Sequence, residues 1–318
     1  MKRFGATVAA AVLLAAALVN AQGDNAPRQG AILRGAAQTN QNKWNAKGPW
    51  AATERSAPVE LQKKEPFKVF DNVHYVGFQT VSSYLVTTSD GLVLIDAGYA
   101  DTVDTLLDSI RRTGNDPKNI THIFVTHSHT DHAGGAAAMK QATGARVGLS
   151  AEDWQEVERQ QSGARGRGQF PVPIQRDLVL KDGESIRVGD AAFRFYFTPG
   201  HTPGSMSVEF QAQDGARSYR TLIPGGLGLH YQKDWGPTFK KSIEKLKAAG
   251  PWDATLGNHP FLGPKDLELV ETELKTRGTG PHPGVLGPQR INAFWDAILK
   301  VVDEKLIAEP PVPLPATN

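Results

Sequence analysis

The chain contains no cysteine among its 318 residues. It can therefore form no disulfide bond, and any metal site that it builds must use histidine and carboxylate side chains. Long apolar runs are also scarce, because residues 6–19 form the only one. That run is too short to cross a bilayer, and polar sequence follows it. We therefore expect no membrane span in the mature protein.

The single apolar run has the features of a secretory signal peptide. Lys2 and Arg3 precede it, and the small residues around Ala21 offer a cleavage site. We predict a signal peptide over residues 1–21 and a mature protein that is periplasmic or secreted. The alternative interpretation of the same run is an uncleaved N-terminal anchor.

A strong excess of charge of either sign is absent as well. The chain has 35 basic and 33 acidic residues, a formal charge of +2, and removal of Lys2 and Arg3 with the signal peptide leaves none. A neutral protein gives no reason to expect nucleic acid as a partner. Arg165 and Arg167 lie in a Gly-rich stretch, 161–176, which is either a lid or a flexible connection.

Glycine and proline are plentiful, with 32 and 21 residues, which indicates many turns and argues against an all-helical bundle. Residues 22–60 are polar and are predicted to form an N-terminal extension; an α+β domain is predicted over 61–308 and a disordered Pro-rich tail over 309–318. Within the domain, two halves each run strands and then helices, which suggests two sheets packed face to face with helices outside. Strands are predicted at 67–70, 73–76, 82–87, 92–95, 120–126, 146–149, 178–180, 185–188, 193–197, 205–210, 217–223 and 254–256. Helices are predicted at 101–112, 135–143, 151–160, 238–248, 265–276 and 288–306.

The most informative segment is 126–132, which reads Thr-His-Ser-His-Thr-Asp-His. Imidazole nitrogen and carboxylate oxygen are ligands that zinc accepts at neutral pH. If 120–126 is a strand, His127 and His129 point the same way, because side chains alternate with period two. Asp131 and His132 then fall where the chain turns towards the next helix. Four candidate ligands would thus meet at one strand-to-helix corner.

Two further histidines lie in loops rich in glycine and proline. His201 lies in Thr-Pro-Gly-His-Thr-Pro-Gly-Ser, and His259 lies in Leu-Gly-Asn-His-Pro. Each loop follows a predicted strand, and loops at one end of a rigid sheet are where sites are built. His74, His122 and His282 lie outside these motifs and are expected to be structural or on the surface, whereas His230 and Tyr231 are candidates for lining a cleft.

Taken in order, these three segments resemble the metallo-β-lactamase superfamily over residues 67–260. The resemblance implies a four-layered αβ/βα sandwich and two zinc ions per chain. It implies that the first zinc is held by His127, His129 and His201, and that the second is held by Asp131, His132 and His259. It also implies hydrolysis by a zinc-bound hydroxide, which the catalytic residue Asp131 would orient while ligating the second zinc.

The position that carries a metal-bridging aspartate in many hydrolases of this superfamily lies in 222–228, which reads Leu-Ile-Pro-Gly-Gly-Leu-Gly. No carboxylate is present there, and the chain has no cysteine to replace it. The pattern that remains resembles subclass B3 of the class B β-lactamases. Gly226 and Gly228 depart from that subclass, which commonly has serines that hold the substrate carboxylate.

We therefore expect an exported, monomeric zinc hydrolase that acts on a small molecule, with the β-lactam amide as the first candidate substrate. The missing aspartate argues against the alternative, a hydrolase of another lactone, ester or amide, and the two glycines argue for it. A third alternative is a non-catalytic zinc-binding protein. Asp96, at the end of the strand 92–95, is either a hydrogen-bond partner of a ligand histidine or a turn aspartate.

Overall fold

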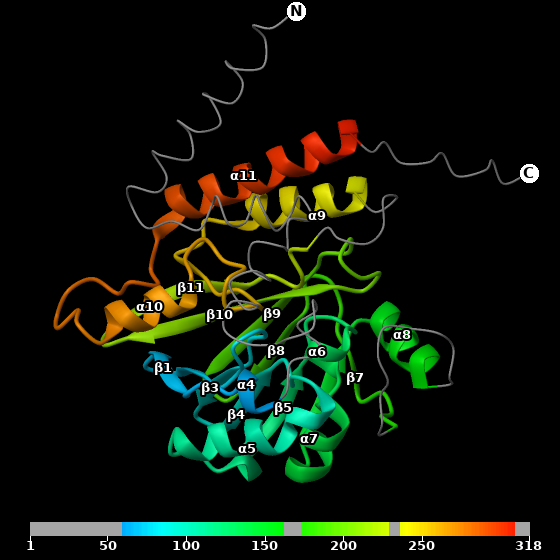
Figure 1. The fold of residues 1–318 in the computed structure, drawn as a ribbon, viewed down its shortest axis with the longest axis vertical. Helices are drawn as coiled ribbons and strands as arrows, with labels where there is room; N and C mark the ends of the chain where they lie inside the picture. Colours follow the sequence, from blue (N-terminus) through cyan, green and yellow to red (C-terminus); the bar gives the residue numbers. More distant parts are fainter. Residues whose placement is uncertain (1–58, 162–172, 229–235, 309–318) are drawn as a thin grey trace, which may run out of the picture.

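The computed structural model describes residues 59–161, 173–228 and 236–308 (Figure 1). The predicted signal peptide, the predicted tail, nearly all of the extension 22–60 and most of the loop 161–176 lie outside the described residues, as do His230 and Tyr231. A short helix, α4 (Val59–Gln62), opens the described chain. Within the described ranges, no helix is both long enough and apolar enough to cross a bilayer.

The first sheet has seven strands whose spatial order follows the chain. The first four pair antiparallel, and the fourth to the seventh pair in parallel, so the sheet is mixed. Its strands are β1 (Phe67–Phe70), β2 (Val73–Tyr75), β3 (Tyr84–Thr88), β4 (Gly91–Ile95), β5 (Ile120–Phe124), β6 (Arg146–Leu149) and β7 (Leu178–Val179).

The second sheet has five strands in the order β12-β11-β10-β9-β8. Only the pair β11·β12 is parallel, so this sheet is mixed too. Its strands are β8 (Ser185–Val188), β9 (Ala191–Phe197), β10 (Met206–Asp214), β11 (Arg217–Ile223) and β12 (Ala254–Thr255).

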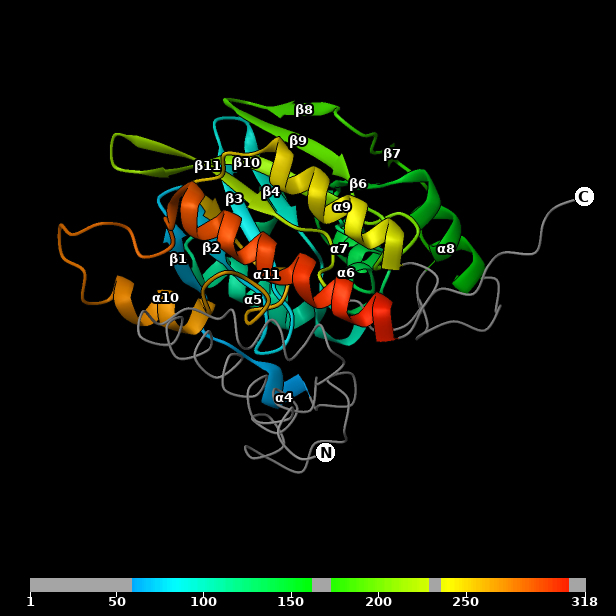
Figure 2. The same ribbon diagram turned by 90° about the horizontal axis from the view of Figure 1, so that it is seen from above.

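Three apolar layers join the sheets and the helices. Between the sheets, Phe124 of β5 packs against Phe193 and Phe195 of β9, with ring centroids 5.4 and 4.9 Å away. The helices α5 (Val103–Arg112), α7 (Ala136–Thr143) and α8 (Ala151–Gln161) cover the outer face of the first sheet. The helices α9 (Gly236–Ala249) and α11 (Gly287–Ala308) lie side by side over the second sheet (Figures 1 and 2).

The expected α+β architecture, a four-layered αβ/βα sandwich, is therefore confirmed. Helix α5 illustrates why the pattern was readable. Its apolar residues at helical spacing, Val103, Leu106, Leu107 and Ile110, are all buried against the sheet. The remaining helices are α6 (Thr130–Ala133) and α10 (Leu267–Leu274), and two 3-10 turns span Ala100–Thr102 and Pro117–Asn119.

One predicted boundary was wrong in a way that affects the site. The strand predicted over 120–126 ends at Phe124. The backbone N–H of Thr126 donates to the Asp96 carboxylate over 2.7 Å, and the carbonyl of Thr126 accepts from Met206 of the other sheet. The chain therefore leaves the first sheet before His127, and strand alternation is not what brings His127 and His129 together.

Candidate metal centre

The candidate ligands lie where strands from both sheets end. In the first sheet, parallel strands β4, β5 and β6 end beside Asp96, the segment 127–132 and the start of α8, respectively. In the second sheet, His201 follows β9 and His259 follows β12. Because these strands run in the same direction within each sheet, their carboxyl ends lie at one edge, and the loops there converge.

The first group of ligand candidates consists of His127, His129 and His201. Their ring centroids are 4.6 to 4.8 Å apart, and all three pairs of rings meet edge to face. One nitrogen from each ring lies within 4.8 Å of the others, which is compatible with binding a single ion. His129 has an extended backbone at the N-cap of α6, and its ring lies edge to face with that of His127.

The second group consists of Asp131, His132 and His259. Oδ2 of Asp131 lies 3.3 Å from Nε2 of His132 and 3.7 Å from Nε2 of His259. The two Nε2 atoms are themselves 3.3 Å apart. Asp131 and His132 belong to the short helix α6, which was expected only as a turn. Each group thus combines residues from the first sheet with one histidine from a loop of the second sheet.

The six sequence-predicted ligands are therefore brought together in two triplets, with the partition that the resemblance implied. The two triplets adjoin, because the rings of His127 and His132 are 4.1 Å apart.

The histidines from the second sheet are oriented by carbonyl groups. Nδ1 of His201 lies 2.6 Å from the carbonyl of Gly228, and Nδ1 of His259 lies 2.6 Å from the carbonyl of Thr80. A carbonyl only accepts, so each Nδ1 carries the proton and donates it. The lone pair is then on Nε2, the atom that faces the other ligands.

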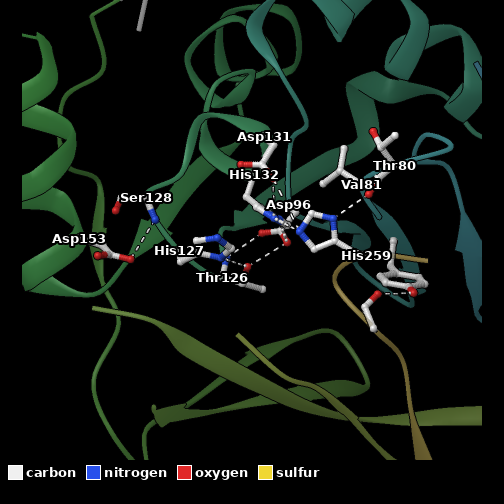
Figure 3. Close-up of polar contacts among 12 residues, drawn as sticks. Thr80, Val81, Asp96, Thr126, His127, Ser128, Asp131, His132, Asp153 and His259 are labelled. Carbon is white, nitrogen blue, oxygen red and sulfur yellow. Dashed lines mark hydrogen bonds and ion pairs between the residues drawn. The ribbon is translucent and has the colours of Figure 1, made fainter. Parts of the chain in front are cut away.

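Asp96 orients the ring of His132 in the same way, through its carboxylate. Its Oδ2 lies 2.7 Å from Nδ1 of His132, and the same oxygen accepts from the Thr126 hydroxyl over 2.9 Å (Figure 3). Asp96 is buried, and its φ of 64° is the only positive φ of a non-glycine residue in the described chain. The hydrogen bond to a candidate ligand histidine is confirmed, and the turn geometry is present as well.

The electrostatics suit a cation. Burial lowers the pKa of His127 well below its usual value and lowers that of His259 to about 4, so both rings are neutral and can donate lone pairs. Burial opposes protonation of His132 too, but the carboxylates of Asp131 and Asp96 outweigh it and raise the pKa of His132 to about 10. Despite its burial, the neighbouring imidazoles hold the pKa of Asp131 well below its usual value. The second group therefore stabilises positive charge.

Two buried polar atoms test whether a metal ion fits here. Nε2 of His127 and Oδ1 of Asp131 are buried and have no hydrogen-bond partner in the structure. An unsatisfied buried acceptor costs about 1–3 kcal/mol, so such atoms are rarely left without a partner. One belongs to each triplet. An ion bound by the first triplet would satisfy Nε2 of His127, and a water molecule bound to an ion in the second triplet would satisfy Oδ1 of Asp131. The donor set of imidazole and carboxylate suits zinc.

The loop after β11 explains why no side chain bridges the two triplets from that side. A Cβ on Gly225 would lie 2.0 Å from the carbonyl oxygen of Met206, and a Cβ on Gly226 would lie 2.5 Å from Cδ2 of His201. Gly226 also has a φ of 85°. The loop is packed so closely against His201 that only glycine fits without displacement.

The histidines outside the motifs take structural places. His282 is buried, stacks on Phe70 at 3.9 Å between centroids, and donates from Nε2 to the carbonyl of Val69 over 2.7 Å. His74 and His122 are half-buried on β2 and β5.

Sequence reasoning missed Thr80, whose carbonyl orients His259, and Asp153, a buried carboxylate of α8. A carbonyl leaves no sequence signal. Asp153 had one, because it lies in the first helical turn after β6, at the edge where the other ligand loops start.

Comparisons with known proteins agree on one family. A family model described as the metallo-β-lactamase superfamily matches residues 76–218, which include all of the ligand candidates except His259. A hydroxyacylglutathione hydrolase of Rhodopseudomonas palustris is 29% identical over 235 residues, covering 67% of this chain and 82% of that protein. The protein of that name from Pseudomonas aeruginosa is 32% identical over 126 residues, and the match spans only 40% of that relative's length.

The solved structures that resemble this fold carry a different name. The subclass B3 metallo-β-lactamase BJP-1 of Bradyrhizobium japonicum superposes with a TM-score of 0.68 at 25% identity, covering 78% of this chain and 96% of that one. The metallo-β-lactamase FEZ-1 from Legionella gormanii gives a TM-score of 0.69 at 25% identity, covering 78% and 97%. The sequence relatives and the structural neighbours therefore point to one fold and to two substrate classes.

Proposed function

Because the chain belongs to the metallo-β-lactamase superfamily and is a hydrolase of that fold, we propose that it is a two-zinc enzyme that opens the β-lactam amide. The observation that carries the proposal is the pair of complete ligand triplets beside a glycine loop. His127, His129 and His201 would hold one ion, and Asp131, His132 and His259 would hold the second. Neither triplet needs a ligand from the loop at Gly226, where no side chain fits.

Zinc ions held by these residues would supply Lewis acidity and would lower the pKa of a bound water molecule to about 7, which would provide a nucleophile at neutral pH. Asp131 is the residue that we assign to orienting that water molecule. Its pKa is held low, so it is a carboxylate that accepts and does not donate, and its Oδ1 is the buried oxygen without a protein partner. Its other oxygen, Oδ2, lies 3.3 Å from Nε2 of His132 and 3.7 Å from Nε2 of His259, so Oδ2 is the oxygen placed to share an ion with these two rings.

The second candidate function is hydrolysis of an acylglutathione thioester. It is supported by the hydroxyacylglutathione hydrolase of Rhodopseudomonas palustris, which aligns over most of its own length. The glycines at 226 and 228 also support it, because they offer no hydroxyl group to hold the carboxylate of a β-lactam. We rank it second because subclass B3 structures superpose over 78% of this chain, with ligand triplets that require no bridging carboxylate here.

The remaining features of the proposal come from the sequence. We propose an exported enzyme, periplasmic or secreted, because residues 1–21 have the pattern of a signal peptide. We also propose that it acts as a monomer on a small molecule and not on nucleic acid, in keeping with its balanced charge.

The test uses the purified mature chain with a chromogenic cephalosporin, an acylglutathione thioester and a panel of lactones and esters. We expect cephalosporin hydrolysis that a chelator abolishes and zinc restores. Thioester hydrolysis without cephalosporin hydrolysis would replace the first candidate by the second. Hydrolysis that is insensitive to the chelator would refute the metal chemistry.

A further inference from the structure

Helix α8 contains a carboxylate that no part of the proposed chemistry uses. Asp153 lies in the first turn of α8, and its side chain is fully buried, with an exposed fraction of 0%. Among the described residues, no lysine or arginine forms an ion pair with it. A buried carboxylate without a cationic partner is costly, so its contacts need an explanation.

The contacts of Asp153 lead to both loops that carry the first ligand triplet. Oδ2 accepts from the backbone N–H of Ser128 over 2.9 Å and from the hydroxyl of Thr202 over 2.8 Å. Oδ1 accepts from the backbone N–H of Gly204 over 3.0 Å. Ser128 lies between His127 and His129, and Thr202 follows His201, so one carboxylate connects the two loops (Figure 3 shows the bond to Ser128).

The surroundings of Asp153 leave it little room to move. Its own N–H donates to the Ser150 hydroxyl, and the Thr202 hydroxyl lies 2.7 Å from that of Ser205, whose oxygen accepts from the Thr202 N–H. A Cβ on Gly204 would lie 2.1 Å from the Ser150 hydroxyl oxygen and 2.5 Å from the Asp153 nitrogen. The His201 loop therefore rests directly on the start of α8, and the carboxylate fills the junction.

Burial is unfavourable for the ionised form of this carboxylate. Burial raises the pKa of Asp153 to about 6, even though its three donors act in the opposite direction. A residue chosen only for packing would avoid this cost, because an apolar side chain of similar volume stabilises a core at least as well.

We propose that Asp153 is a positioning residue that sets the separation of the two loops and so holds His127, His129 and His201 in metal-binding geometry. The inference rests on the proposed function only in taking this triplet as a metal site. The carboxylate of Asp153 accepts from the backbone of Ser128 and Gly204 and from the hydroxyl of Thr202, so it acts on the ligands through the two loops. Residues that support metal ligands in this way contribute about 10–100-fold to metal affinity.

The decisive variant is Asp153→Asn, which keeps the size of the side chain but presents an NH₂ group to donors on one side. We expect its zinc affinity to fall by about 10–100-fold at one site and to stay unchanged at the other. The measurement is zinc bound per chain against free zinc in a buffered series. Glu152→Gln is the matched control, because Glu152 is the exposed neighbour of Asp153 in the same helical turn and loses the same charge. We expect two zinc ions of unchanged affinity for it.

Two double variants identify the site that is weakened. In Asp153→Asn/His259→Ala, which lacks a ligand of the second triplet, we expect the one remaining zinc ion to bind about 10–100-fold more weakly than in His259→Ala alone. In Asp153→Asn/His201→Ala, which lacks a ligand of the first triplet, we expect the remaining zinc ion to bind as tightly as it does in His201→Ala alone. Weakening of both sites to the same extent would overturn the proposal.

Thr202→Val keeps the proposal testable if Asp153→Asn does not fold. It removes one of the three hydrogen bonds, and we expect a fall of about 3–10-fold in affinity, again at one site only, because one hydrogen bond contributes about that factor. If the variants lower the thermal stability of the metal-free protein but bind two zinc ions as tightly as the parent, Asp153 is structural and the proposal is wrong. A parent chain that binds no zinc would instead refute the proposed function.

Discussion

The two ligand triplets are held in place by different means. In the second triplet, the Asp96 carboxylate touches a ligand ring directly, at 2.7 Å from Nδ1 of His132. In the first triplet, the Asp153 carboxylate is hydrogen-bonded to the loops that carry the ligands, at Ser128, Thr202 and Gly204. Asp96 therefore controls the protonation and orientation of one ring, whereas Asp153 controls the distance between two segments. Losing either carboxylate should weaken one metal site and leave the other intact.

The largest expected effect comes from deleting one ligand of each triplet in turn. We expect His201→Ala and His259→Ala each to reduce bound zinc from two ions per chain to one and to lower hydrolysis by at least about 100-fold, because both ions act on one substrate. Metal content and initial rates check this. His122→Ala, outside both triplets, is the control and should keep both ions.

If His201→Ala and His259→Ala each lost both ions, the triplets would be one cooperative site, and the comparison between them would fail.

Replacing Asp96 by Asn tests the direct contact. Asparagine tolerates the φ of 64° at this position, so the backbone is preserved. With the amide oxygen accepting from the Thr126 N–H, the NH₂ group faces Nδ1 of His132 and makes that atom an acceptor. Nε2 then carries the proton and loses its lone pair. We expect the affinity of the second site to fall by about 10–100-fold, measured by zinc titration.

Asp101→Asn is the matched surface control for this variant, because Asp101 is exposed. An unchanged second site in Asp96→Asn would show that Asp96 serves the turn alone.

The difference between the triplets also shows which features of the fold and of the site could be predicted from the sequence. The helix at Val103–Arg112 was readable because four apolar residues share one face, and the ligand motifs were readable because each keeps its residues within a few positions. The end of β5 could not be predicted from the sequence, because the backbone N–H of Thr126 donates to Asp96, thirty residues earlier in the chain. The place of Asp153 after β6 could be read from the sequence, but its role could not, because two of its three donors are backbone N–H groups, at Ser128 and Gly204, in distant loops.

The glycine loop gives a smaller effect, which separates geometry from substrate binding. From the sequence alone, Gly226 looks like a lost serine. In the structure, a Cβ there would lie 2.5 Å from His201, and the φ of 85° is unfavourable for other residues. We expect Gly226→Ser to lower the free energy of unfolding by about 1–3 kcal/mol and to weaken the first zinc site, because the ring of His201 must move.

Gly215→Ser is the control for backbone strain, because Gly215 has a φ of 59° and open space where its Cβ would lie. We expect Gly215→Ser to destabilise the protein without loss of zinc. If Gly226→Ser instead kept its zinc and had a lower KM for a cephalosporin, the added hydroxyl group would be binding the substrate, as the serines of subclass B3 do.

The smallest expected effect concerns His282, a buried histidine outside both triplets whose two nitrogens are both hydrogen-bonded to backbone groups. Nε2 donates to the carbonyl of Val69, and Nδ1 accepts from the N–H of Gly284. Burial lowers the pKa of His282 below 6.5, and Arg277 adds to the effect. As the pH falls through 6.5, the unfolded chain therefore binds a proton before the folded chain does, and stability is lost.

For His282→Gln, we expect a loss of about 1–2 kcal/mol at pH 7, from the hydrogen bond and the stacking on Phe70. The difference in free energy of unfolding between the variant and the parent should become smaller towards pH 5. Only the parent loses stability as the pH falls, because its buried ring stays neutral while the same ring in the unfolded chain binds a proton. Urea unfolding of both metal-free proteins at pH 5, 6 and 7 measures it, since the histidines of the triplets contribute equally to both. A stability difference that is constant or widens as the pH falls would mean that folding does not lower the pKa of His282.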